Sequence, residues 1–173
     1  MPDAAAYSAV ETLRDGRRIE IRALRPSDRE DMIKAVGQTG AESFYRRFFS
    51  PRRDFTEQQI AYFVNVDFSS HVALVAVAEE DGRPAIVGGG RYIVCEPACA
   101  ELAFAVIDRY QGQGVGSALL RHIVGLARDA GLAELVADVL PENIPMLTLL
   151  RRSGFDFDAR RGPGAVHARR RIA

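Results

Sequence analysis

Glycines at positions 112, 114 and 116 alternate with other residues in the stretch QGQGVG, and the helix-like pattern SALL follows them directly. Glycine in the first turn of a helix costs stability relative to alanine, so this spacing indicates that bare backbone is needed there. Free N–H groups and the dipole at a helix N-terminus favour an anion, and the lack of Cβ atoms lets a phosphate approach closely. The loop therefore predicts a phosphate site on the amides of residues 113–117.

Several phosphate compounds suit such a loop, and the residues around it narrow the choice. A P-loop is excluded, because GQGVGSALL lacks the Gly-Lys-Ser/Thr ending that reaches terminal phosphates. A dinucleotide fingerprint remains an alternative: Gly112, Gly114 and Ser117 take its three positions, and Glu134 follows at the spacing of a ribose ligand. Against it, the motif follows a hairpin pattern, and too few strand–helix units remain for a doubly wound sheet. A tight turn that holds no ligand is the other alternative.

Hydropathy periodicity and turn residues divide the chain into the elements that must position this loop. Residues 1–15 are Ala-rich and aperiodic, which indicates a loose leader, and residues 16–173 are expected to form one domain. Ser27 or Asp28 is expected to cap the first helix, and Asn143 the last. The patterns predict, in order, a strand at 17–24, helices at 25–36, 41–49 and 56–64, a hairpin at 71–94 that turns at Asp81-Gly82, a strand at 100–107, a helix after the glycines to Ala130, a strand at 134–140, a helix at 144–153, and strands at 155–159 and 165–172. This order predicts a mixed α/β sheet.

Composition excludes several classes of protein. The 173 residues carry 23 basic and 23 acidic side chains, so no net charge attracts nucleic acid or a membrane surface. No apolar run is long enough to span a membrane, and the N-terminus is too polar for a signal peptide. Cys95, Cys99 and the three histidines show no zinc spacing, and the two cysteines are expected as small buried thiols. We therefore expect a cytoplasmic protein without a metal.

The stretch QGQGVG resembles the Gln/Arg-x-x-Gly-x-Gly/Ala loop that binds the acyl-CoA pyrophosphate in the GNAT acetyltransferase superfamily. The strand AELAFAVIDRY, the later LPENIPMLTLLRRSGF and the order of elements extend the resemblance over about residues 18–172. More narrowly, ESFYRRFFS and VDFSSHVALVAV are similar to the catalytic domain of Pat-type bacterial protein lysine acetyltransferases. The resemblance implies a GNAT fold: a mixed, mostly antiparallel sheet with a splayed central pair of parallel strands and flanking helices.

The resemblance also implies acetyl-CoA as the cosubstrate. From Val106 back to Glu101 the strand spans about 16 Å, which is comparable to an extended pantetheine arm. In the resembled fold, the backbone near Val106 pairs with the cofactor and can donate to the thioester oxygen. Asn143 has two roles that are compatible, a helix cap and a cofactor contact. The expected cofactor-binding residues are Val106, Gln111, Gly112, Gln113, Gly114, Val115, Gly116, Ser117 and Asn143.

Glu101 is the expected general base, as in the Pat-type pattern. An amine must lose its proton before it attacks a thioester, and a carboxylate in apolar surroundings has a raised pKa that suits this task. Many members of the superfamily place a tyrosine seven residues after the asparagine as general acid, but that position is Leu150 here. The acid is thus unassigned. Lesser candidates for acid–base roles are His71, His122, His167, Asp67 and Asp138.

The acceptor of the acyl group is the open question. The segment FYRRFFSPRRDF, residues 44–55, mixes arginines with aromatic residues. It is either an ordinary amphipathic helix or a wall of the acceptor site, where arginine would suit an acidic partner or a carboxylate on a small amine. The Pat resemblance implies a protein lysine, for example on an acyl-CoA synthetase. The alternatives are a small amine, a protein N-terminus, or a sensor that binds acyl-CoA without turnover.

Overall fold

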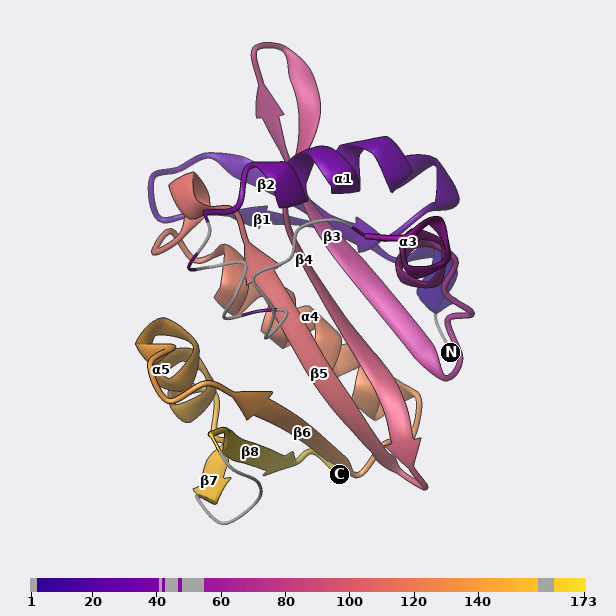
Figure 1. The fold of residues 1–173 in the computed structure, drawn as a ribbon, viewed down its shortest axis with the longest axis vertical. Helices are drawn as coiled ribbons and strands as arrows, with labels where there is room; N and C mark the ends of the chain where they lie inside the picture. The colour runs from indigo at the N-terminus through magenta and orange to yellow at the C-terminus, as the bar shows by residue number, and fades with distance from the viewer. Residues whose placement is uncertain (1–2, 41, 43–46, 48–54, 159–163) are drawn as a thin grey trace.

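The computed structural model describes residues 3–40, 42, 47, 55–158 and 164–173, which form one eight-stranded sheet with helices on both faces (Figure 1). The strand order is β1-β2-β3-β4-β5-β6-β8-β7, and every neighbouring pair is antiparallel except β5–β6. The strands are β1 (Ser8–Thr12), β2 (Arg18–Ala23), β3 (His71–Glu80), β4 (Arg83–Glu96), β5 (Cys99–Val106), β6 (Glu134–Val139), β7 (Asp156–Asp158) and β8 (Val166–Arg171). The helices are α1 (Arg29–Gly37), α3 (Glu57–Val64), α4 (Val115–Asp129) and α5 (Ile144–Arg152), with short 3-10 turns at Ala4–Ala6, Pro26–Asp28 and Asp108–Tyr110. The predicted mixed sheet with a central parallel pair is confirmed.

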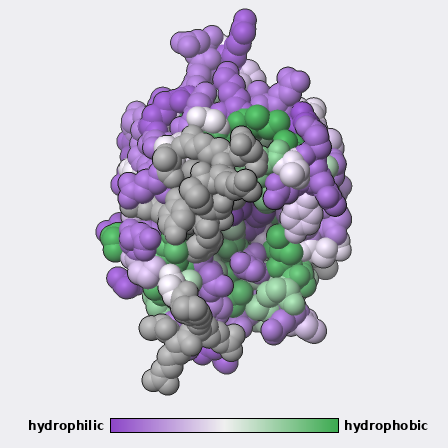
Figure 2. Space-filling model, viewed as in Figure 1, coloured by the Kyte–Doolittle hydropathy of each residue, from purple (hydrophilic) through white to green (hydrophobic). Residues whose placement is uncertain are grey.

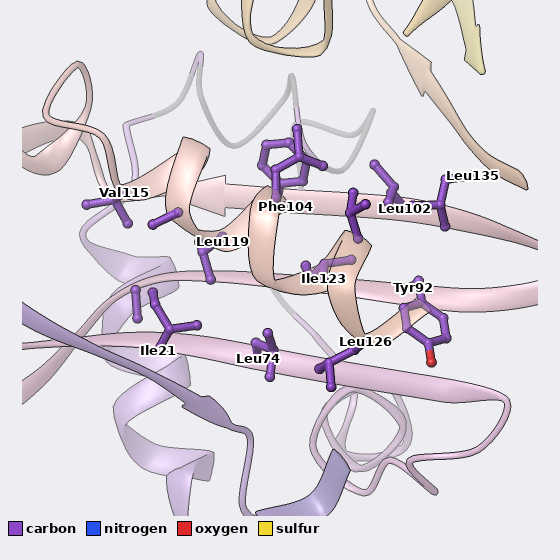
Figure 3. Close-up of a cluster of buried hydrophobic side chains, with 14 of the residues drawn as sticks. Ile21, Leu74, Tyr92, Leu102, Phe104, Val115, Leu119, Ile123, Leu126 and Leu135 are labelled. Carbon is purple, nitrogen blue, oxygen red and sulfur yellow. The ribbon is translucent and has the colours of Figure 1, made fainter. Parts of the chain in front are cut away.

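The main core lies between α4 and the centre of the sheet (Figure 3). Apolar residues recur along α4 at helical spacing, and Leu119 and Ile123 are fully buried against β3, β4 and β5. A Cβ built on Gly90 would meet the Cδ1 of Ile123 at 2.5 Å. Bare backbone in β4 therefore lets α4 lie close to the sheet, directly behind the strand that precedes the glycine loop.

The opposite face of the sheet carries a smaller apolar cluster beneath α1. Its buried members are Leu24, Ala73, Val75, Val77 and Ile86. Met32 and Ala35 of α1 pack against this cluster from outside. The two helices α1 and α4 thus cover opposite faces, and the strands between them present side chains alternately to each face.

The N-terminal segment differs from the sequence expectation. Residues 1–15 were expected as a loose leader, yet Ser8–Thr12 form β1, which pairs with β2 through Ala9 and Ile21. The strand alternates only between exposed and partly buried residues, so its hydropathy pattern is weak. Backbone pairing at the sheet edge, rather than burial, holds this strand, and periodicity alone does not detect that.

The elements expected from residue 17 onward are confirmed where the structure describes them. The N-terminal cap of α1 differs from the expectation for Asp28. The Asp28 side chain does not cap α1 but lies buried, 2.7 Å from the Arg22 guanidinium. The two thiols also differ from the expectation, because Cys95 is exposed and Cys99 partly buried where they flank the β4–β5 turn. Apart from Glu42 and Arg47, the predicted helix at 41–49 lies outside the described residues.

Candidate functional site

The central feature of the site is the point where β5 and β6 separate. Their parallel ladder has three register pairs, of which Glu101 with Val136 is the last. Yet β5 continues to Val106 and β6 to Val139. The two strands therefore diverge immediately after Glu101, within the part of the chain that the structure describes.

The backbone of β5 beyond Glu101 presents hydrogen-bonding groups to this opening. The amide of Ile107, at the end of β5, donates to the carbonyl of Val87, at 3.0 Å. In an antiparallel ladder such hydrogen-bonded pairs alternate with pairs whose backbone groups point the other way. The Val106 register pair with Gly88 is of the second kind, as are those of Phe104 and Leu102. Their N–H groups therefore point away from β4, toward β6.

A cavity of about 680 Å³ occupies the space between the diverging strands. Its walls come from β5, the glycine loop, the C-terminal half of β6 and α5. Of the ten site residues expected from the sequence, eight line this cavity: Glu101, Val106, Gln111, Gly112, Gly114, Gly116, Ser117 and Asn143. The structure thus brings together residues that lie more than forty positions apart in the chain.

Glycine is required at the three positions of the loop for different structural reasons. Gly112 and Gly114 have φ values of +74° and +101°, which only glycine adopts without strain. Gly116 is helical, and a Cβ there would lie 3.2 Å from a methyl carbon of Leu149 on α5. Two glycines thus shape the turn, and the third allows α4 and α5 to approach each other.

The loop leaves backbone donors available at the N-terminus of α4. The first amide that follows the helical hydrogen-bond pattern is that of Ala118, which donates to the carbonyl of Gly114 at 3.0 Å. The amides of residues 115–117 precede it and have no partner within the helix. Gly116 and Ser117 line the cavity, where the positive end of the helix dipole favours an anion.

Gln113 and Val115 do not line the cavity. The Gln113 side chain donates to the carbonyl of Arg109 at 3.0 Å, and Val115 is buried in the core behind the loop. Their contribution to a phosphate site would come from backbone amides alone. The side chain of Gln111 instead donates to the Val106 carbonyl at 3.0 Å, which ties the loop to the end of β5.

Glu101 lies exposed in the wall of the cavity, at the point of divergence. It was expected in apolar surroundings, but a cation lies near it. Burial lowers the pKa of Arg47 to about 10, and the negative charge of Glu101 opposes that shift. Glu101 and Arg47 thus form the charged part of this wall.

Asn143 and Leu150 are two of the residues that the α5 region contributes to the cavity lining. The Asn143 side-chain oxygen accepts from the Met146 amide at 3.3 Å, so the predicted cap is confirmed, and its side chain also lines the cavity. Leu150, at the position where the resemblance led us to look for a tyrosine, is fully buried. No hydroxyl from this position reaches the cavity.

Sequence reasoning missed two cations in the cavity wall, Arg14 and Arg152. Arg14 follows β1, and its amide donates to the carbonyl of Gln113 at 3.3 Å, which places it beside the glycine loop. The segment carrying Arg14 has no motif, and only its pairing in the sheet brings this side chain to the loop. Arg152 stands in the last turn of α5, where a basic residue is ordinary at a helix C-terminus.

The lesser acid–base candidates lie apart from the opening or are engaged elsewhere. His122 is partly buried and joins the Tyr7 hydroxyl to the Glu11 carboxylate. His167 contacts Asp138 at 2.8 Å, and of these two only Asp138 lines the cavity. Asp67 accepts hydrogen bonds within its own loop.

A second cavity, of about 430 Å³, lies on the face of the sheet that carries α1 and α3. The space-filling view of this face shows apolar surface within mostly polar surroundings (Figure 2). Thr39, Arg47, Ala103 and Ala105 line both cavities, so the two adjoin at β5. His71 is buried beside the second cavity, where burial, together with the charge of Arg91, lowers its pKa to about 4.

No helix in the described part of the chain has both the length and the apolar character that crossing a membrane requires. Within the same residues, no group of three or more His, Cys, Asp or Glu side chains is placed to hold a metal ion. The polar groups that the described residues bring to the candidate site include backbone amides, the carboxylates of Glu101 and Asp138, the amide of Asn143 and the arginines.

Comparison with known proteins identifies the family of this chain. The model of the acetyltransferase (GNAT) family matches residues 36–155. Acetyltransferase PA5475 of Pseudomonas aeruginosa is 31% identical over 147 residues, which cover 84% of this chain and 79% of that protein. Acetyltransferase Pat of Mycolicibacterium smegmatis is 31% identical over 144 residues, or 82% of this chain, but the match spans only 42% of the length of Pat.

Among solved structures, the GNAT domain of PAT from S. lividans is similar with a TM-score of 0.87 and 32% identity, over 95% of this chain and 96% of that one. This similarity and the family match rule out the dinucleotide alternative, because the glycine loop, the diverging strands and α5 occur here in the order of an acetyltransferase. The chain belongs to the GNAT family of acetyltransferases and is similar to the Pat proteins within it.

Proposed function

We propose that this enzyme transfers the acetyl group of acetyl-CoA to a primary amine, and that the amine is a lysine side chain of a protein. The observation that carries the proposal is the divergence of β5 and β6 at Glu101, above a loop with free helix N-terminal amides. The similarity to Pat supports a protein lysine, but this chain spans less than half of Pat. The acceptor is therefore part of the proposal.

The binding part of the proposal assigns three contacts. The pyrophosphate of acetyl-CoA lies on the amides of residues 115–117, where Arg14 adds a positive charge. The pantetheine arm follows β5 and uses the outward N–H groups in place of the missing strand partner. Asn143 contacts the cofactor from the start of α5.

The chemical part of the proposal is direct transfer. Glu101, or a water that it holds, takes a proton from the ammonium group, because an amine of this kind is mostly protonated near neutral pH. The amine nitrogen then attacks the thioester carbon, and the N–C bond forms as the C–S bond breaks. The Val106 N–H stabilises the negative oxygen. CoA leaves as the thiolate, since Leu150 supplies no proton, and the extra proton that the attacking nitrogen still carries is lost to water.

The proposal is tested by release of CoA from acetyl-CoA with purified wild type, offered an acyl-CoA synthetase in one arm and a panel of small amines in the other. The Glu101→Gln variant gives the background. Release with the synthetase, together with an acetyl-lysine found by peptide mass spectrometry, supports the protein-lysine acceptor. Release only with a small amine rejects that acceptor but keeps the acetyl transfer. Binding of acetyl-CoA without release in any arm favours an acyl-CoA sensor.

A further inference from the structure

The second cavity has a lining that combines apolar side chains with an unusual charge. Its walls include Met32, Ile33 and Val36 of α1, Ile60 and Phe63 of α3, and the glycines 88–90 of β4. Arg47 and Arg91 are the two charged residues among its described lining residues, and both are cationic. A cavity of this size is large enough for a small organic molecule.

Among the described residues, Arg91 has only neutral partners. Its guanidinium donates to the carbonyl of Phe63 at 3.1 Å and contacts the Nε2 of His71 at 3.0 Å. It also lies 4.9 Å from the centre of the Phe63 ring. Because the pKa of His71 is about 4, this imidazole is neutral at pH 7. Among the ion pairs of the described residues, none involves Arg91.

The second guanidinium increases the positive charge at this place. Arg47 lies close enough that its charge, in addition to burial, lowers the pKa of Arg91 to about 10. Arg91 nevertheless stays charged at neutral pH. A partly buried cation without a counter-charge is costly, and the planar guanidinium matches a carboxylate in two parallel hydrogen bonds. An anion in the cavity would offset this cost.

We propose that this cavity is a binding site for a small apolar monocarboxylate, with Arg91 as the residue that binds the carboxylate. The apolar walls of α1 and α3 take the rest of the ligand. The contact of the guanidinium with the Phe63 ring and carbonyl holds it in place for the ligand.

The site adjoins the proposed catalytic centre. Arg91 is the register partner of Ala103, which stands two residues from Glu101 on the same face of β5. Ala103 and Ala105 line both cavities. The ligand is therefore either an amine acceptor that carries its own carboxylate, in place of the protein lysine proposed above, or a separate small acid beside the path of the acceptor. This last step rests on the proposed function, whereas the binding of the carboxylate does not.

The binding is tested without acetyl-CoA, by calorimetric titration with 3-phenylpropionate and its neutral amide, 3-phenylpropanamide. Wild type is expected to bind the carboxylate at least tenfold more tightly than the amide. In Arg91→Met this preference is expected to fall below threefold. Arg83→Met, the same change at an exposed position of β4, keeps the wild-type preference.

Equal affinity of wild type for the acid and the amide overturns the proposal, as does a preference that persists in a folded Arg91→Met variant. Where Arg91→Met fails to fold by circular dichroism, Arg91→Lys decides. It keeps the charge but lacks the planar fork, so the carboxylate affinity is expected to fall at least threefold with amide affinity unchanged. Unchanged carboxylate affinity in Arg91→Lys contradicts the role of Arg91.

A second pair of probes distinguishes the two sources of the carboxylate. With acetyl-CoA present, faster acetylation of 6-aminohexanoate than of hexylamine, lost in Arg91→Met, identifies an acceptor that carries the acid. Inhibition by 3-phenylpropionate that raises the acceptor KM and leaves the acetyl-CoA KM unchanged identifies a separate acid. Either result supports the site. Carboxylate binding without any acetyl transfer rejects the proposed function and retains this site.

Discussion

Glu101 and Val136 form the last pair of the parallel β5–β6 ladder, so the proposed base stands where the sheet opens. Up to this pair, β5 and β6 are hydrogen-bonded to each other. After Glu101, the backbone of β5 faces a cavity of about 680 Å³. A rigid ladder therefore positions the carboxylate at one end of the opening, while the glycine loop forms the other end. The separation of these two ends is set by the length of β5.

Replacing Glu101 by Gln tests the role of this carboxylate. Turnover is expected to fall by about 10²- to 10⁴-fold, because general-base catalysis contributes that much, while the dissociation constant of acetyl-CoA stays within about twofold. Steady-state kinetics and calorimetry measure the two quantities. Glu79→Gln is the matched control, since Glu79 is exposed at the far end of β3. Turnover equal to that of wild type would exclude Glu101 as the base.

Two glycines of the same region give a paired test of backbone strain. Gly114→Ala forces alanine to φ +101°, and the free energy of unfolding is expected to fall by about 1–2 kcal/mol. Gly125 lies inside α4, and a Cβ added to it would meet no atom within 4 Å, so Gly125→Ala is expected to raise that free energy by about 0.5–1 kcal/mol. Denaturant unfolding followed by circular dichroism measures both. The changes in the free energy of unfolding of the two variants must have opposite signs. A decrease in both variants would contradict backbone strain at position 114 as the reason.

Arg14 is expected to contribute to cofactor binding through its charge. Arg14→Met should weaken acetyl-CoA binding by about threefold to tenfold at low salt, and the difference should shrink at high ionic strength, because exposed charges are screened. Titrations at two salt concentrations measure it. Arg18→Met, at an exposed position of the neighbouring β2, serves as the control. An Arg14 effect no larger than that of Arg18 removes Arg14 from the site.

His71 makes stability depend on pH in a defined window. Burial and the charge of Arg91 lower its pKa from 6.5 to about 4, so between these values the unfolded chain binds a proton that the folded protein does not. The free energy of unfolding therefore falls as the pH decreases from 6.5 to 4, by up to about 3 kcal/mol, and this contribution is fully present above pH 6.5.

The His71→Gln variant should flatten this dependence, because glutamine does not titrate and its oxygen can still accept from Arg91. Denaturant unfolding at pH 4.5, 5.5 and 7.5 compares the two proteins. If both lose stability equally over this range, another group is responsible for the dependence.

The local patterns of the sequence determined the parts of the site that lie close together along the chain. The three glycines, the capping residue Asn143 and the strand that carries Glu101 follow from backbone conformation, capping chemistry and hydropathy period. These requirements act within a few residues, so they can be recognised in the sequence without a structure. The resemblance to a family then predicted how the elements with these local patterns are arranged in one fold and one site.

Tertiary structure alone decided which distant residues surround that site. Arg14 reaches the glycine loop because β1 pairs with β2 at the sheet edge, and Arg91 lies in an apolar cavity because α1 and α3 cover its face of β4. Neither arginine has a spacing or neighbour that marks it in the sequence. The charge environment of a side chain depends on elements that fold against it from elsewhere in the chain, and it therefore appears only when those elements are packed.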